Sequence, residues 1–114
     1  MVKDYIPQKG HIVWIDFNPH KGSEQAGKRP ALVLSPAIYN QKTGLCLVVP
    51  ITTQEKGYPF EKTIKTNVLS GVVLCDQIKN FDYKARNFSY ADKLNSKSFN
   101  EIIDFITSVV ITKI

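Results

Sequence analysis

Short apolar runs, separated by glycine, proline and polar residues, constrain the fold of this chain more than any other feature. Each run has the length and composition of a β-strand, so we expect five to seven short strands. Residues 60–66 alternate in polarity, as a half-buried strand does. Pro50 within its run indicates an edge strand or a bulge, because proline cannot donate to a strand ladder. The runs cover residues 11–17, 30–35, 45–52, 60–66, 71–79 and 86–91.

The C-terminal segment changes to the period of a helix. Ser98 and Glu101 fit a capping box at its start, and Ser96 is an alternative N-cap. We expect the apolar stripe of this helix to pack on the sheet, with a partner-binding helix as the alternative. Strands followed by one helix predict a compact β-barrel fold. The stripe consists of Phe99, Ile102, Ile103, Ile106, Val109 and Val110.

Length and charge set the class of protein. The chain has 114 residues, 43% of them hydrophobic, which fits one globular domain over residues 1–114. We place the barrel at about 8–92 and the helix at about 96–112. The formal net charge is +5, and a basic surface attracts phosphate backbones. The charge is spread along the chain, so it favours a folded basic surface, and it also fits a basic protein with no polyanionic partner.

Cysteine usage and the termini bear on the compartment. Cys46 and Cys75 each lie in an apolar run, where we expect buried free thiols, although a single disulfide is possible. The N-terminus lacks the apolar core of a signal peptide, and no apolar stretch approaches the roughly 18 residues of a membrane span. We therefore expect a reduced, cytoplasmic protein that does not bind membranes. No Cys/His spacing suits zinc and no cofactor motif is present, so we expect no metal and no cofactor.

The most informative segment is the polar loop 18–29 and its junction with the following strand. Pro30 fixes the backbone where Arg29 enters the sheet, and a planar guanidinium suits bidentate recognition of phosphate. Taken alone, an arginine at such a position is more often solvated or salt-bridged. His20 lies in the same loop and could contact a ligand, whereas His11 opens a strand.

The combination of GSEQAGKRP at 22–30 with PITTQ at 50–54 is far more specific than any short motif in the chain. Further stretches extend it, and together they closely resemble the MazF/PemK/ChpB family of toxins from bacterial toxin–antitoxin pairs. The resemblance runs from about residue 3 to residue 92, and the C-terminal helix matches in position and pattern. The matching stretches are 13–17, 21–30, 32–36, 39–44, 49–54, 56–60 and 76–79.

This resemblance implies a mainly β (α+β) fold, a small SH3-like barrel of the CcdB/MazF type. It also implies a homodimer whose substrate groove crosses the dimer interface. The implied activity is that of an endoribonuclease that cuts single-stranded mRNA at short motifs and so arrests translation and growth. By the family pattern, Arg29 and Thr52 look like the catalytic pair, and Glu24 looks like a further contributor.

RNA cleavage without a metal uses the ribose 2′-OH as nucleophile and leaves a 2′,3′-cyclic phosphate and a 5′-OH. Such a site must stabilise the anionic intermediate and move two protons. Arg29 can stabilise the negative charge, and Thr52 can donate to a phosphoryl oxygen or orient the 2′-OH. Glu24 is a reasonable base once it is desolvated, and His20 is an alternative.

Single-stranded RNA is held by stacking on aromatic rings and by hydrogen bonds to base edges. Trp14 is a weaker candidate than the others, because an aromatic residue on a strand usually belongs to the core. The candidate RNA contacts are His20, Trp14, Phe17, Asn40, Lys56, Tyr58, Gln77, Lys79 and Arg86.

A toxin of this kind needs a neutralising partner, and a basic groove predicts an acidic, partly disordered MazE-like antitoxin segment that folds on binding. Two other functions remain open. A gyrase poison on the same barrel depends on a C-terminal Trp-Gly-Ile, whereas this chain ends Ile111-Thr112-Lys113-Ile114. A barrel that only binds nucleic acid is the other alternative.

Overall fold

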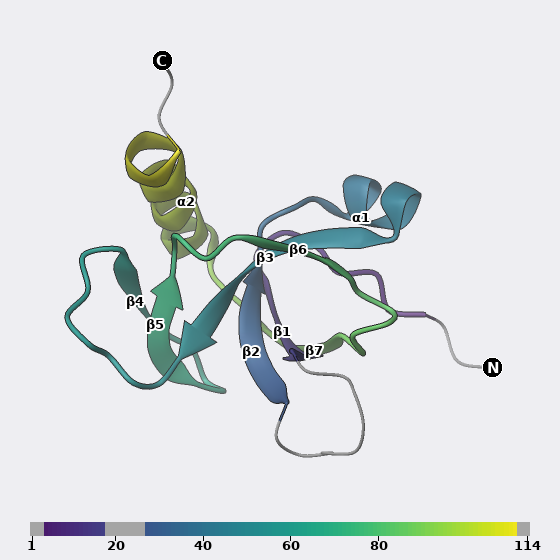
Figure 1. Cartoon of the computed structure of the whole chain (residues 1–114), viewed down its shortest axis with the longest axis horizontal. Coiled ribbons are helices and arrows are strands. Elements are labelled where there is room, and N and C mark those ends of the chain that lie inside the picture. Colours follow the sequence, from purple (N-terminus) through teal and green to yellow (C-terminus); the bar gives the residue numbers. More distant parts are fainter. Residues whose placement is uncertain (1–3, 18–26, 112–114) are drawn as a thin grey trace.

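Seven strands form one strongly curled antiparallel sheet in the computed structural model, which describes residues 4–17 and 27–111 (Figure 1). The order of the main path is β4-β5-β3-β2-β1-β7, and β6 pairs separately with β3. The mainly β class predicted from the apolar runs is thus confirmed. The strands are β1 (His11–Asp16), β2 (Lys28–Val33), β3 (Leu45–Thr52), β4 (Glu61–Lys65), β5 (Ser70–Leu74), β6 (Lys79–Asp82) and β7 (Ser89–Lys93).

An edge strand or a bulge was predicted at Pro50. Strand β3 is the centre of the sheet, so the edge strand is wrong, and the pairing of β3 with β2 reaches Pro50 without a shift in register, so there is no bulge in that ladder. On one side β3 pairs with β2, and on the other it pairs first with β6 and then with β5. The amide of Leu34 donates to the carbonyl of Leu47 at 2.8 Å, so these two residues form a hydrogen-bonded pair. Hydrogen-bonded and non-hydrogen-bonded pairs alternate along an antiparallel ladder, which makes Ala31 and Pro50 a non-hydrogen-bonded pair. The nitrogen of Pro50 therefore faces away from β2, toward the gap where β3 has left β6 and has not yet paired with β5. No strand in that gap requires a donor from Pro50.

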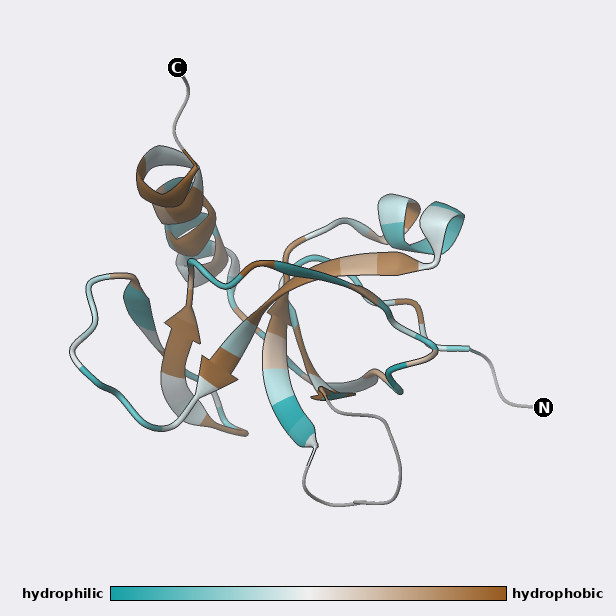
Figure 2. Ribbon diagram, in the orientation of Figure 1, coloured by the Kyte–Doolittle hydropathy of each residue, from teal (hydrophilic) through white to brown (hydrophobic). Residues whose placement is uncertain are grey.

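Apolar residues fill both faces of the central strands, which explains why β2 and β3 read as continuous apolar runs. One cluster lies under the C-terminal helix and includes Leu32, Val49 and Ile102. The other lies inside the curl of the sheet and includes Val33 and Val48. Figure 2 shows hydrophobic residues along β3, in the second half of β2 and in the helix, with hydrophilic residues at the start of β2 and in many of the connections.

The C-terminal helix α2 (Ser96–Phe105) packs on the sheet, as predicted, and continues as a π-helical turn, η1 (Ile106–Val110), in which Val109 of the predicted stripe is exposed. Its N-cap is Asn95, whose side chain accepts a hydrogen bond from the amide of Ser98 at 2.8 Å. The cap therefore precedes both Ser96 and the predicted capping box. A short helix, α1 (Ala37–Thr43), was not predicted; it follows Pro36 and ends at Gly44, which has a positive φ of 74°.

The other differences concern where strands end. A single strand over 71–79 was expected, but β5 ends at Leu74 and a turn leads into β6 at Lys79. The last strand lies at Ser89–Lys93 rather than at 86–91. Cys46 and Cys75 are buried free thiols, so no disulfide joins them. In the described part of the chain, every helix is too short or too polar to cross a membrane.

Candidate functional site

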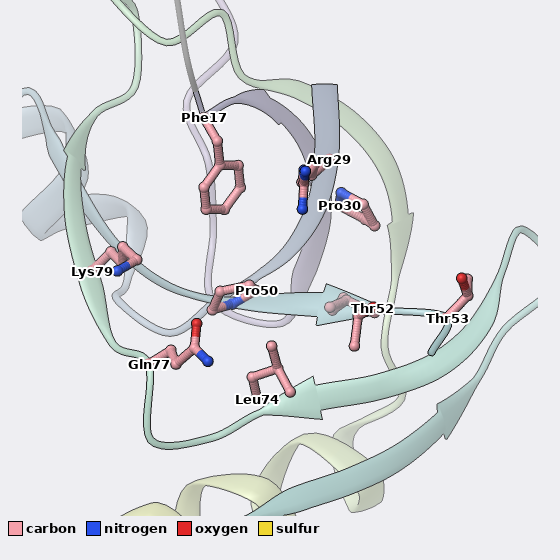
Figure 3. Close-up of a pocket in the computed structure, with 10 residues that line it drawn as sticks. Phe17, Arg29, Pro30, Pro50, Thr52, Thr53, Leu74, Gln77 and Lys79 are labelled. Carbon is pink, nitrogen blue, oxygen red and sulfur yellow. The ribbon is translucent and has the colours of Figure 1, made fainter. Parts of the chain in front are cut away.

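A cavity of about 460 Å³ opens where the end of β1, the start of β2 and the end of β3 meet the segment between β5 and β6 (Figure 3). The side chains of Phe17 and Arg29 point into this space, and Thr52 and Leu74 lie across from them. Both cationic and apolar groups face it, so it offers an anion a place beside flat apolar surfaces. Its lining consists of Phe17, Arg29, Pro30, Pro50, Ile51, Thr52, Thr53, Leu74, Gln77 and Lys79.

The pairing of β2 with β3 brings Arg29 and Thr52 together. In that register Ala31 lies opposite Pro50. Arg29 precedes Ala31 by two residues and Thr52 follows Pro50 by two. Because side chains alternate between the faces of a strand, Arg29 and Thr52 lie on the same face as that pair. Two residues that are far apart in sequence therefore line the same cavity. Arg29 is exposed, and Thr52 is half-buried.

The hydroxyl of Thr52 already accepts one hydrogen bond within the protein. Its oxygen accepts a hydrogen bond from the amide of Gln54 at 3.2 Å. A hydroxyl has one proton to donate and two lone pairs that accept. The proton of Thr52 thus stays available for an acceptor in the cavity, such as a phosphoryl oxygen.

The charge of the cavity is positive. Arg29 and Lys79 are its charged lining residues, and the lining includes no carboxylate among the described residues. Nearby, Lys28 lies 3.8 Å from the carboxylate of Asp16, which compensates part of its charge. Within residues 4–17 and 27–111, no ion pair involves Arg29. The arrangement can bind a phosphate group and stabilise additional negative charge on it.

Three of the predicted RNA contacts line this cavity, and the other described candidates do not. Phe17, Gln77 and Lys79 are lining residues. Tyr58 is exposed outside it, and its hydroxyl donates to Asp76 at 2.5 Å, beside Gln77 in the chain. That hydrogen bond is the main cause that raises the pKa of Tyr58 above its usual value. Lys56 is exposed in the same 53–60 connection and does not line the cavity.

Trp14 and the loop residues need separate mention. Trp14 is half-buried on β1, opposite Pro30, and is not a lining residue. Glu24 and His20, the two candidates for the base, lie outside the described residues.

Asn40 is an internal residue, so the structure does not support the prediction that it contacts RNA. It is completely buried on α1. Its amide nitrogen donates to the carbonyl of Pro7 at 2.8 Å and to that of Ser35 at 3.1 Å, and its oxygen accepts from the Ser35 hydroxyl at 2.5 Å. These bonds fasten the N-terminal segment and the β2–α1 connection to each other.

Arg86 is also engaged inside the protein. Its guanidinium donates to the carbonyls of Asp16 and Phe17, at 3.3 and 2.5 Å. It also covers the ring of Phe81, with 4.3 Å from the guanidinium carbon to the ring centroid. The predicted phosphate contact is thus replaced by contacts to the end of β1.

Sequence patterns missed several residues that shape the cavity. Thr53 and Leu74 line it. Thr53 lies within the PITTQ motif at 50–54 but was not named as a contact, and no signal in the sequence marks Leu74. Gly71 lies against the backbone of Thr52, where a side chain would not fit. A glycine inside a strand is a known sign of close backbone approach, and this signal could have identified it. Among the described residues, no group of three or more His, Cys, Asp or Glu side chains could hold a metal ion.

The chain matches the family described as "PemK-like, MazF-like toxin of type II toxin-antitoxin system" over residues 8–110. It is 57% identical over 86 residues to the endoribonuclease toxin MazF of Escherichia coli K12, and the matched region covers 75% of this chain and 78% of that toxin. It is similar in structure to MazF from Deinococcus radiodurans, with a TM-score of 0.82, 42% identity, and coverage of 96% of this chain and 100% of that one.

A second Deinococcus radiodurans structure, of MazE–MazF, matches with a TM-score of 0.82 and 38% identity, over 96% of this chain and 100% of that chain. The family match spans most of the chain and includes every described lining residue of the cavity. The chain therefore belongs to the family of PemK-like, MazF-like toxins of type II toxin–antitoxin systems.

Proposed function

We propose that this toxin is a sequence-specific endoribonuclease that cleaves single-stranded mRNA without a metal, by attack of the ribose 2′-OH on the adjacent phosphate. The observation that carries this proposal is the placement of Arg29 and Thr52 on one face of a cationic cavity. The likeness to the endoribonuclease toxin MazF supports the same activity. Cleavage of mRNA would arrest translation and growth.

Each of the two residues has a task that suits its chemistry. The guanidinium of Arg29 stabilises the negative charge that builds on the phosphoryl oxygens, and it remains charged because its proton is not lost in proteins. The hydroxyl oxygen of Thr52 accepts a hydrogen bond from the amide of Gln54, and its O–H donates a hydrogen bond to a phosphoryl oxygen. The products are a 2′,3′-cyclic phosphate and a 5′-OH.

Neither residue is a suitable base, so another group must remove the proton of the 2′-OH. We propose Glu24 for this role, with His20 as the alternative. A carboxylate removes a proton more readily once bound RNA has excluded water from it. The 5′ oxygen is protonated as its bond to phosphorus breaks, which gives the 5′-OH end.

The rest of the cavity holds the RNA. We propose that Phe17 stacks on a base, that Gln77 bonds to a base edge, and that Lys79 contacts a phosphate. Lys56, Tyr58 and Trp14 lie outside the cavity and would contact nucleotides further along the strand. The buried Asn40 is excluded from this set.

We propose two protein partners. The first is a second copy of this chain, because the cavity is open and a second protomer would extend it into a groove long enough for several nucleotides. The second is an acidic antitoxin segment that covers the cationic cavity, a proposal that the similarity to a MazE–MazF structure supports. We place the toxin in the cytoplasm, where its mRNA substrate is, and treat the chain as one domain.

The test is cleavage of a long unstructured RNA in the presence of EDTA, followed by mapping of both new ends. We compare the wild type with Arg29→Ala and with Thr52→Val and Thr52→Ser, which separate the hydroxyl from the size of the side chain. Discrete cuts with cyclic-phosphate and 5′-OH ends are expected. Loss of one preorganised donor typically costs about 100-fold or more in rate, so Arg29→Ala and Thr52→Val should fall by this factor.

Thr52→Ser keeps the hydroxyl and should retain most of the activity. Thr63→Ala, an exposed threonine on β4, is the control that should cut like the wild type. If the folded, antitoxin-free wild type bound RNA but did not cut it, a binding function would replace the proposed one. If it did neither, a gyrase-inhibition assay would follow.

A further inference from the structure

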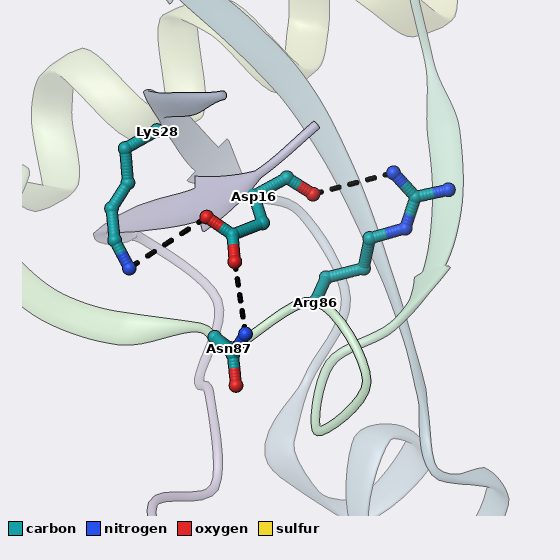
Figure 4. Close-up of polar contacts among 4 residues, drawn as sticks. All are labelled: Asp16, Lys28, Arg86 and Asn87. Carbon is teal, nitrogen blue, oxygen red and sulfur yellow. Dashed lines mark hydrogen bonds and ion pairs between the residues drawn. The ribbon is translucent and has the colours of Figure 1, made fainter. Parts of the chain in front are cut away.

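We infer that Arg86 is a positioning residue: it fixes the ring of Phe17 as one wall of the cavity and thereby controls RNA binding without contacting RNA. This inference rests on the proposed function, because it concerns how the same cavity holds its substrate. It reassigns Arg86 from a phosphate contact to an internal support of the site. Figure 4 shows the polar contacts at the end of β1, where Arg86, Asn87 and Lys28 each contact Asp16.

The first line of evidence is the backbone of Phe17. One guanidinium nitrogen of Arg86 donates to the carbonyl of Phe17 at 2.5 Å and to that of Asp16 at 3.3 Å. In return, the amide of Asp16 donates to the carbonyl of Arg86 at 2.9 Å. These bonds join residues about seventy positions apart, so the end of β1 depends on the segment that carries Arg86.

The second line of evidence is the ring of Phe17 itself. The guanidinium of Arg86 lies over Phe81, 4.3 Å from the ring centroid. Phe81 in turn meets Phe17 edge to face, with centroids 5.5 Å apart and an interplanar angle of 88°. Arg86 therefore supports Phe17 in two ways: it bonds the carbonyl group of Phe17, and it covers the ring of Phe81 that packs against the ring of Phe17.

Other bonds hold the same point. The amide of Phe17 donates to the carbonyl of Gly27 at 2.9 Å, which ties the end of β1 to the start of β2, just before Arg29. The side chain of Asn87 donates to Asp16 at 2.9 Å. The amide of Phe17 is thus bonded to Gly27, and its carbonyl is bonded to Arg86. Among these supports, Arg86 is the residue that also covers an aromatic ring.

A positioning residue and a phosphate contact predict different responses to salt. For single-stranded nucleic acid, each phosphate contact contributes about 0.7 to the slope of log K against log salt. If Arg86 acts through Phe17, removing its charge should weaken binding and leave this slope unchanged. Arg86 is half-buried and already bonded to carbonyl oxygens, which favours this outcome.

The probe is an oligoribonucleotide that contains a cleavage site mapped on the long RNA and carries one 2′-deoxy nucleotide at the scissile position, so that it binds but is not cut. Its affinity is measured across a range of salt for the full chain, for Arg86→Gln and for Arg86→Lys. Lys79→Gln, which removes a proposed phosphate contact, serves as the comparison. Lys84→Gln removes an exposed charge two residues away and is the control expected to bind like the wild type.

We expect Arg86→Gln to bind about fivefold or more weakly, the lower end of what loss of one base stack costs, with an unchanged salt slope. Lys79→Gln should lower the slope by about 0.7. Arg86→Lys keeps the charge but lacks the planar fork that bonds carbonyls and covers a ring, so it should not restore binding. In a Phe17→Leu background, Arg86→Gln should cause little further loss, because both changes remove the same wall.

Three results would overturn the inference. These are a salt slope lowered by about 0.7 in Arg86→Gln, full rescue by Arg86→Lys, and additive losses with Phe17→Leu. Circular dichroism confirms that each variant is folded at the assay temperature; if Arg86→Gln does not fold, Arg86→Lys alone decides the question. Absence of binding by the wild type would instead contradict the proposed function, so the two failures are distinguishable.

Discussion

Gly71 on β5 faces the carbonyl group of Thr52 on β3 so closely that a Cβ atom on Gly71 would lie 2.5 Å from the Thr52 oxygen and 3.2 Å from its carbonyl carbon. Real side chains do not approach backbone atoms so closely, so one of the two strands would have to move. The absence of a side chain at Gly71 thus lets β5 pair with the end of β3, where Thr52 lies opposite Val72.

The first prediction follows from this contact. Gly71→Ala should displace the backbone of Thr52, reduce RNA cleavage, and destabilise the fold by about 1–3 kcal/mol, as overpacking does. Urea unfolding and the cleavage rate of the folded fraction are the measurements. Ser70→Ala, an exposed neighbour on the same strand, should change neither. Wild-type cleavage by a stable Gly71→Ala protein would show that the position of Thr52 does not depend on this contact.

The second prediction concerns the buried amide of Asn40. Asn40→Ala should lower the free energy of unfolding by about 1–3 kcal/mol, because the carbonyls of Pro7 and Ser35 lose a donor. Cleavage by the folded fraction should stay near that of the wild type. The matched control is Asn80→Ala, whose exposed amide donates only to the hydroxyl of Tyr39, at 3.2 Å. A stable Asn40→Ala protein that failed to bind RNA would restore the RNA-contact role.

The third prediction is a pH dependence of stability. His11 packs against both Tyr5 and Tyr90, which also contact each other, and its Nδ1 is 2.6 Å from the Tyr5 hydroxyl. Desolvation, and then the charge of Lys93, lower the pKa of His11 below its ordinary value of 6.5. The unfolded chain therefore binds the proton more readily than the folded one. The stability contributed by neutral His11 is present above pH 6.5 and is lost as the pH falls from there toward the folded pKa.

Urea unfolding at about pH 8 and at about pH 5 tests this, with His11→Gln as the comparison. The wild type should lose more stability on acidification than His11→Gln does. Equal losses in both proteins would assign the pH dependence to other groups.

The fourth prediction is that both thiols are inert while the protein is folded. Burial raises the pKa of Cys46 to about 12 and that of Cys75 to about 11. The thiolate is the reactive form, so neither cysteine should react with an alkylating reagent at neutral pH until the chain unfolds. Mass spectrometry after iodoacetamide treatment, with and without urea, measures this. Rapid labelling of the folded protein would contradict it.

Local patterns were sufficient for elements whose residues carry their own signal. The strand expected at 45–52 coincides with β3, and the one at 11–17 differs from β1 by one residue. Helix α1 was missed because its residues, AIYNQKT, show little apolar periodicity; Pro36 before it and Gly44 after it were the available signals. The break between β5 and β6 was missed because neither glycine nor proline marks the turn at Cys75 and Asp76.

The site depends on tertiary register, which the sequence does not display. Nothing local shows that Arg29 and Thr52 share a face, because that follows from the pairing of Ala31 with Pro50. Their proposed roles were therefore available only through the family resemblance. Asn40 was misassigned for the same kind of reason: one of its partners, the carbonyl of Pro7, lies 33 positions away in the chain.

The position of the cavity beside the change of partners along β3 has an evolutionary consequence. At Val49 and Pro50, one edge of β3 has already left β6 and has not yet met β5. The residues that span this break, such as Gln77, belong to the connection between β5 and β6 and make no strand pairing. The residues on β2 and β3 do take part in strand pairing. We therefore expect substitutions to accumulate in the connection while the reacting face stays constant, so that toxins of this lineage could acquire new target sequences without rebuilding their cleavage chemistry.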